Sequence, residues 1–129
     1  MASVTLTPFL TVKDARAAVE FYKKAFGAIE ISRQSSPNGQ FIIEMSIDGE
    51  RFYAVDENPP AFNVSPTTLG GTSVRISLIV DDPDEVADRA VAAGAKIVFP
   101  VEDQSYGMRQ GRVADPAGHH WLIGRPLRR

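Results

Sequence analysis

The sequence contains no cysteine, and its only two histidines are adjacent, at positions 119 and 120. The absence of cysteine excludes disulfides, thiol nucleophiles and cysteine-ligated zinc. Successive residues of a strand point to opposite faces, so His119 and His120 cannot chelate one ion together. A histidine-rich metal centre is therefore excluded.

The chain also lacks a long apolar run and an excess of basic residues. Its formal net charge is −2 and its pI is about 5.6, which gives no support for nucleic-acid binding. Residues 1–5 have neither a basic region nor an apolar stretch, so we expect no signal peptide, no membrane partner and a cytoplasmic location. The Gly70-Gly71 pair lacks the Lys-Ser/Thr of a phosphate-binding loop.

The most informative feature that is present is an internal repeat within 129 residues, a length suited to one domain. Residues 9–28 read FLTVKDARAAVEFYKKAFGA, and residues 76–95 read ISLIVDDPDEVADRAVAAGA. Each segment is a strand, an acidic cap, a helix with an apolar stripe and then Gly-Ala, followed by strand-like segments. The sequence therefore predicts an α+β fold made of two βαβββ modules with a cleft between them.

The predicted modules occupy about residues 4–57 and 73–125 of a single domain spanning 1–129. In the first, we expect strands over 4–12, 29–33, 41–47 and 51–55 and a helix over 15–26. In the second, we expect strands over 74–80, 96–101, 109–114 and 119–124 and a helix that starts at Pro83 and ends at Gly94. Residues 56–72 are rich in proline and glycine, which favours a plain linker over a mobile loop above a site.

Several motifs, spread over nearly the whole chain, resemble those of the vicinal oxygen chelate superfamily. This superfamily includes glyoxalase I, extradiol dioxygenases and bleomycin-resistance proteins, and the PhnB-like subgroup is the most similar. The two motifs that carry most of the resemblance are FYKKAFGA at 21–28 and DPAGH at 115–119. The resemblance implies the fold, but it implies activity only weakly, because function depends on the site.

The resemblance also identifies four positions that hold metal ligands in the metal-dependent members. Here those positions carry Thr7, Glu44, Arg75 and Leu122. Only Glu44 could bind a divalent cation well, and the positive charge of the Arg75 side chain would repel such a cation. We therefore expect no stoichiometric metal and no cofactor.

Strand alternation predicts which side chains line the cleft. The expected ligand-binding residues are Thr7, Phe9, Glu44, Arg75, Tyr106, His120 and Leu122. Tyr106 is placed at the mouth, where it could stack on a planar ligand. A buried carboxylate needs a partner, so Glu44 is expected either to pair with Arg75 or to share a ligand with it.

Other prominent residues are predicted to be structural. By parity Trp121 faces the opposite side to His120, toward the core, and the helical stripe places Tyr22 and Phe26 there as well. His119 is expected to make a structural hydrogen bond within its turn motif.

The leading functional hypothesis is a metal-free protein that binds a small aromatic or amphipathic molecule, as bleomycin-resistance proteins do. The alternatives are a lyase or dioxygenase of the same superfamily with displaced ligands, or an assembly protein with a vestigial cleft. The resemblance also implies a homodimer. The sequence leaves open whether the modules pair within one chain or across the dimer.

Overall fold

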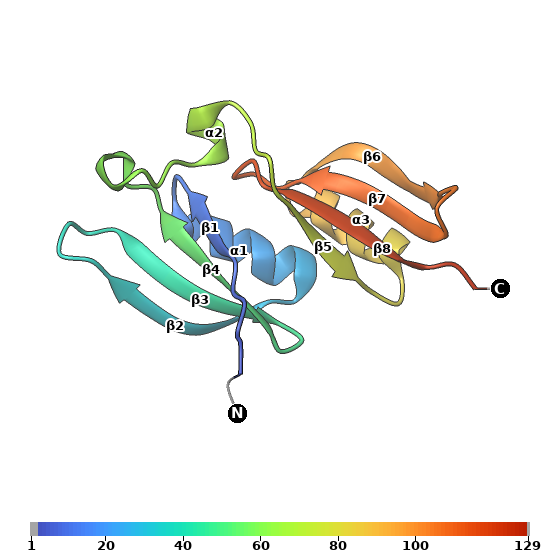
Figure 1. Cartoon of the computed structure of the whole chain (residues 1–129), viewed down its shortest axis with the longest axis horizontal. Coiled ribbons are helices and arrows are strands. Elements are labelled where there is room, and N and C mark those ends of the chain that lie inside the picture. The colour runs from blue at the N-terminus through green and yellow to red at the C-terminus, as the bar shows by residue number, and fades with distance from the viewer. Residues whose placement is uncertain (1–2, 129) are drawn as a thin grey trace.

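The computed structural model describes residues 3–128, and it contains two four-stranded sheets (Figure 1). The first sheet has the order β1-β4-β3-β2, in which β1 runs parallel to β4 and the other pairs are antiparallel. Its elements are β1 (Phe9–Val12), α1 (Ala15–Phe26), β2 (Ile29–Ser35), β3 (Phe41–Ile47) and β4 (Glu50–Asp56). The predicted first βαβββ module is confirmed.

The second sheet repeats this topology with the order β5-β8-β7-β6. The strand β5 is parallel to β8, as β1 is to β4, and the remaining pairs are antiparallel. Its elements are β5 (Arg75–Ile79), α3 (Pro83–Ala92), β6 (Lys96–Asp103), β7 (Met108–Ala114) and β8 (His120–Pro126). The internal repeat in the sequence is therefore a repeat of topology.

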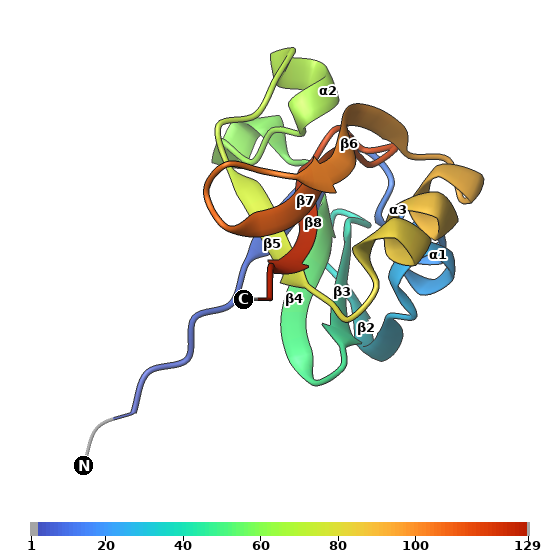
Figure 2. The same ribbon diagram turned by 90° about the vertical axis from the view of Figure 1, so that its right-hand side faces the viewer.

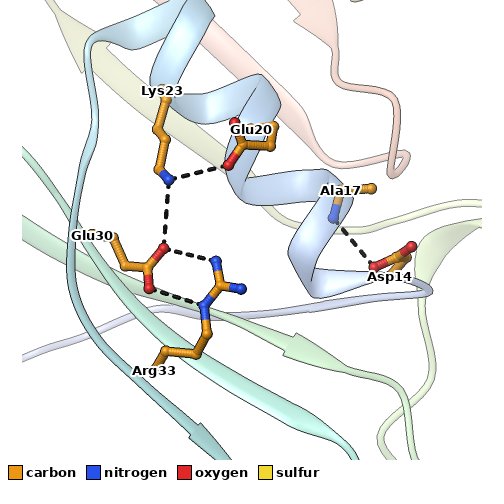
Figure 3. Close-up of polar contacts among 6 residues, drawn as sticks. All are labelled: Asp14, Ala17, Glu20, Lys23, Glu30 and Arg33. Carbon is orange, nitrogen blue, oxygen red and sulfur yellow. Dashed lines mark hydrogen bonds and ion pairs between the residues drawn. The ribbon is translucent and has the colours of Figure 1, made fainter.

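Local signals fix the ends of α1. The side chain of Asp14 accepts a hydrogen bond from the backbone N–H of Ala17, and Gly27 ends the helix in the left-handed region at φ 66°. Figure 3 shows this cap and a chain of ion pairs in which Lys23 bridges Glu20 of α1 and Glu30 of β2. These pairs are partly exposed, so they contribute little to stability.

Both helices lie on the same side of the two sheets, and the opposite side is bare (Figure 2). The helices α1 and α3 pack against each other. Trp121 of β8 is 1% exposed and lies 4.8–5.9 Å, centroid to centroid, from the rings of Tyr22, Phe26 and Phe52 in the first module. The predicted core role of Trp121 is confirmed, and its ring joins the two modules.

A buried carboxylate lies at the centre of this junction. Asp115 accepts hydrogen bonds from Tyr22 Oη at 2.6 Å and from Trp121 Nε1 at 2.9 Å. Its second oxygen accepts from the backbone N–H groups of Ala117 and His119. Burial, and then the charge of Asp115, raises the pKa of the Tyr22 hydroxyl well above its ordinary value, so Tyr22 remains a donor.

His119 makes the expected structural hydrogen bond. Its Nε2 lies 2.7 Å from the carbonyl oxygen of Thr11, which belongs to the other module. The bond ties the turn before β8 to β1, so the motif at 115–121 holds the modules together at several points.

Two expectations about elements are wrong. The first strand begins at Phe9 and not at Val4, because Pro8 has no N–H to donate to a ladder. The segment predicted to be a plain linker contains the 3₁₀ helix η1 (Pro59–Ala61) and the short helix α2 (Pro66–Leu69). Proline at the first helical positions and the Ser65 cap favour these turns. None of the helices within residues 3–128 combines the length and apolar composition that a membrane crossing requires.

Candidate functional site

The candidate site lies on the open face, which we define as the side of the two sheets that points away from α1 and α3. In the first module, alternation places Phe9 and Glu44 on this face, because Leu10, Ile43 and Met45 are buried toward α1. In the second module, Arg75, His120 and Leu122 lie on it. Their neighbours Trp121 and Ile123 are buried on the other side. The helices α1 and α3 lie on the other side of the sheets (Figure 2), and only the short helix α2 lies next to this face, where it lines a cavity with Phe9.

A cavity of about 330 Å³ opens on the second module's part of the open face. Three predicted site residues, Arg75, Tyr106 and Leu122, line it together. The rest of its lining is Phe99, Pro100, Glu102, Gln104, Gln110, Gly111 and Arg112. Apolar groups from Phe99, Pro100 and Leu122 therefore share the cavity with several polar and charged side chains that could orient a ligand.

His120 does not line this cavity, but it contacts a residue that does. The Nε–H of Arg112 donates a hydrogen bond of 2.9 Å to Nδ1 of His120. An accepting Nδ1 must be unprotonated. His120 therefore acts on the cavity by orienting the Arg112 guanidinium.

Sequence reasoning missed Arg112, Gln110 and Phe99. The strand at 109–114 was predicted, and its alternation could have placed Gln110 and Arg112 on the same face as the neighbouring Leu122. Phe99 pairs with Arg112 only after a register shift in β6, which the sequence does not reveal.

Glu44 is 9% exposed, but its partner is not Arg75. Its Oε2 lies 2.7 Å from Nε of Arg51 on the adjacent strand β4, and Ser32 Oγ donates to Oε1 at 3.4 Å. The expected Glu44–Arg75 pair is therefore absent within one chain, because Glu44 and Arg75 belong to different sheets. Glu44 is also not part of the lining of the second module's cavity.

The two remaining predicted residues, Thr7 and Phe9, lie at the start of the first module. The ring of Phe9 stacks on Tyr53 with centroids 4.3 Å apart. Phe9 lines a separate cavity of about 450 Å³ beneath α2, between β1 and β5, whose walls include Leu69, Val74 and His119. Thr7 precedes β1 and lines neither cavity. Within one chain, the predicted cleft residues therefore lie on the faces of both modules and do not meet in a single cavity.

The bond between Arg112 and His120 gives a testable titration. Burial, and then the charge of Arg112, lowers the pKa of His120 from its ordinary value. In the Arg112→Gln variant, the second cause is removed, so we expect the pKa of His120 to rise. Proton NMR titration of the His120 imidazole signals in the parent chain and in the variant would show this. An unchanged or lower His120 pKa would contradict the contact.

This architecture, two βαβββ modules with helices on one side and an open sheet face on the other, is that of the glyoxalase-type α+β proteins. The model of the Glyoxalase/Bleomycin resistance protein/Dioxygenase superfamily matches residues 3–123, so the chain belongs to this superfamily. The predicted superfamily and fold are confirmed.

Two relatives by sequence, from a mycobacterium and a plant, bear the name uncharacterized protein. The chain is 45% identical over 127 residues to Mb0911c of Mycobacterium bovis, a match that covers 95% of this chain and 84% of that protein. It is 31% identical over 115 residues to At5g48480 of Arabidopsis thaliana, a match that covers 82% of this chain and 68% of that protein.

Among solved structures, TioX from Micromonospora sp. ML1 aligns with a TM-score of 0.74 and 29% identity over 97% of this chain and all of that one. Glyoxalase I from Zea mays aligns with a TM-score of 0.75 over 95% of this chain and 44% of that one. Its identity is 15%, so this second likeness concerns the fold alone.

The metal of the metal-dependent members does not fit the residues present here. Thr7, Glu44, Arg75 and Leu122 occupy the expected ligand positions, and Glu44 is already bound to Arg51. Within residues 3–128, no group of three His, Cys, Asp or Glu side chains is arranged to hold a metal ion.

Proposed function

We propose that this protein binds a small aromatic or amphipathic molecule on its open face, without a metal, in the manner of a bleomycin-resistance protein. The observation that carries the proposal is the cavity of about 330 Å³ on a sheet face without a helical cover. Its apolar wall contains Phe99 and Leu122, and polar groups converge on it from β5, β6 and β7. The aromatic Tyr106 at its rim supports assignment to the PhnB-like subgroup.

We further propose that a second copy of the chain covers the open face. Large apolar side chains are exposed on it: Phe9 is 62% exposed, Ile79 60% and Phe99 58%. An exposed apolar surface of this kind typically marks an interface. Before β1, residues 3–8 extend away from the sheets on the side opposite to the helices (Figure 2), and they also expose Val4 and Leu6.

The repeated topology of the two sheets supports one arrangement of the two copies. A two-fold axis would place the first module of one copy over the second module of its partner, so that both cavities are covered. The predicted cleft would then form across the dimer.

The experiment that tests ligand binding is a thermal melt against a panel of small aromatic compounds. A compound that binds only the native state raises the melting temperature, by roughly 5–10 °C at a hundredfold excess over its Kd. We expect Leu122→Trp, which fills the second module's cavity, to abolish the shift. The matched variant Leu69→Trp, in the cavity beneath α2, should retain it.

Two results would contradict this proposal. A panel without any melting shift would favour an assembly protein with a vestigial cleft. About one tightly held divalent ion per chain in elemental analysis would favour a metal-dependent lyase or dioxygenase with displaced ligands.

A further inference from the structure

The second module's cavity is chemically asymmetric. Arg75 of β5 and Arg112 of β7 approach it from two sides of β8, on which Leu122 lies between them. The register pairs Arg75 with His120 and Arg112 with Leu122. Strands two apart in a sheet are roughly 10 Å from each other, a distance that two arginine side chains reaching inward can share. One end of the cavity is therefore cationic.

No carboxylate neutralises this end. Among residues 3–128, neither Arg75 nor Arg112 lies within 4.0 Å of an acidic oxygen. By contrast, Arg33, Arg51 and Arg109 each form such an ion pair. Arg75 is exposed and Arg112 is half-buried, so water can reach both guanidinium groups and an anion could take its place.

The one carboxylate in the lining belongs to the other end. Glu102 pairs across the sheet with Gln110, which is two residues along β7 from Arg112, or about 7 Å. Tyr106 Oη donates to Gln110 Oε1 at 2.9 Å, so this end is fixed by its own hydrogen bonds. The cavity therefore runs from a positive end to an end rich in hydrogen-bond acceptors.

The contact with His120 leaves the terminal NH₂ groups of Arg112 available for a ligand. His120 accepts the Nε–H at 2.9 Å and thereby orients the guanidinium plane. Among residues 3–128, no hydrogen bond engages the terminal NH₂ groups of Arg112. Terminal guanidinium N–H groups form short, strong bonds to carboxylate, sulfonate and phosphate oxygens.

From this geometry we infer that the ligand is an aromatic anion, whose charged group lies between Arg75 and Arg112 and whose ring lies against Phe99 and Leu122. His120 is a positioning residue for Arg112. The inference rests on the proposed function and adds the chemical class of the ligand. Aromatic carboxylates, sulfonates and phosphates all fit this description, because each carries a negatively charged oxygen group on a flat apolar ring.

Two fluorescent probes of similar shape separate the charge from the ring. The first is 8-anilinonaphthalene-1-sulfonate, and the second is N-phenyl-1-naphthylamine, which lacks the sulfonate. We expect both to bind the full chain. Each of Arg75→Gln and Arg112→Gln should weaken the sulfonate probe about tenfold and leave the neutral probe unchanged. Raising the salt concentration should weaken the sulfonate probe alone.

The matched control is Arg89→Gln, which removes the same charge from the exposed surface of α3, on the helical side of the molecule. It should bind both probes as the parent chain does. Displacement of the sulfonate probe by 1-naphthoate or by 1-naphthyl phosphate then distinguishes a carboxylate ligand from a phosphate ligand.

The outcomes separate the two proposals. If both probes bind and the arginine variants bind the sulfonate unchanged, the anion site is wrong while the proposed function stands. If neither probe binds, the proposed function and the anion site both fail. The melting temperature of each variant, measured alongside, confirms that it is folded, and Arg112→Lys should recover part of the sulfonate affinity because it restores the charge.

Discussion

Replacing Asp115 with alanine is expected to lower the free energy of unfolding by about 3–5 kcal/mol. The carboxylate is 4% exposed and accepts four hydrogen bonds, from Tyr22, Trp121 and the backbone of Ala117 and His119. Alanine would leave all four donors without this acceptor in the junction between the modules. Urea denaturation monitored by Trp121 fluorescence would measure the loss.

Two further variants test the cause. Asp88 is an exposed aspartate on α3, so Asp88→Ala should change the free energy of unfolding by no more than about 0.5 kcal/mol. Tyr22→Phe removes one of the four donors and should cost about 1–2 kcal/mol. If Asp115→Ala cost less than about 1 kcal/mol, the carboxylate would not be the centre of the junction.

The second large effect concerns association. In the proposed dimer, Phe9 lies on the covered open face, so Phe9→Glu would bury a carboxylate without a designed partner. We expect the dimer dissociation constant to rise roughly a hundredfold. Because Phe9 is 62% exposed in one chain, the variant should still fold. Light scattering at micromolar concentration would measure the mass, and circular dichroism would check the fold.

The matched substitution is Phe62→Glu. Phe62 is 93% exposed and follows η1, away from the sheets, so this variant should remain dimeric. A clean monomer mass for the parent chain, or equal masses for both variants and the parent, would contradict the proposed interface.

Most of the secondary structure followed from the sequence because its signals are local. The Asp14 cap and the Gly27 terminator lie within a few residues of the bonds they make. Asp48-Gly49 forms a tight turn between β3 and β4, with φ of 49° and 86°, and such a dipeptide favours a hairpin turn by itself. Trp121 could be placed in the core by parity alone, because alternation along a strand is a backbone property.

The partner of Glu44 could not be predicted from strand alternation alone. The sequence leads to the expectation that Glu44 either pairs with Arg75 or shares a ligand with it, but its partner is Arg51, seven positions along the chain and across the β3–β4 hairpin. Arg112 was overlooked, although it lines the cavity together with Arg75. The register of two paired strands decides which residues face each other, and a bulge or a turn can shift that register by one residue.

The sequence by itself determined the two βαβββ modules, the ends of α1, the start of α3 and the superfamily, since repeated motifs and periodicity encode local geometry. Only the tertiary structure decided that both helices lie on one side, that Asp115 and Trp121 join the modules, and that Arg75 and Arg112 share a cavity. These contacts join distant residues: the bond from Tyr22 to Asp115 spans 93 positions. They depend on how the packed modules orient each other, and no local pattern records that orientation.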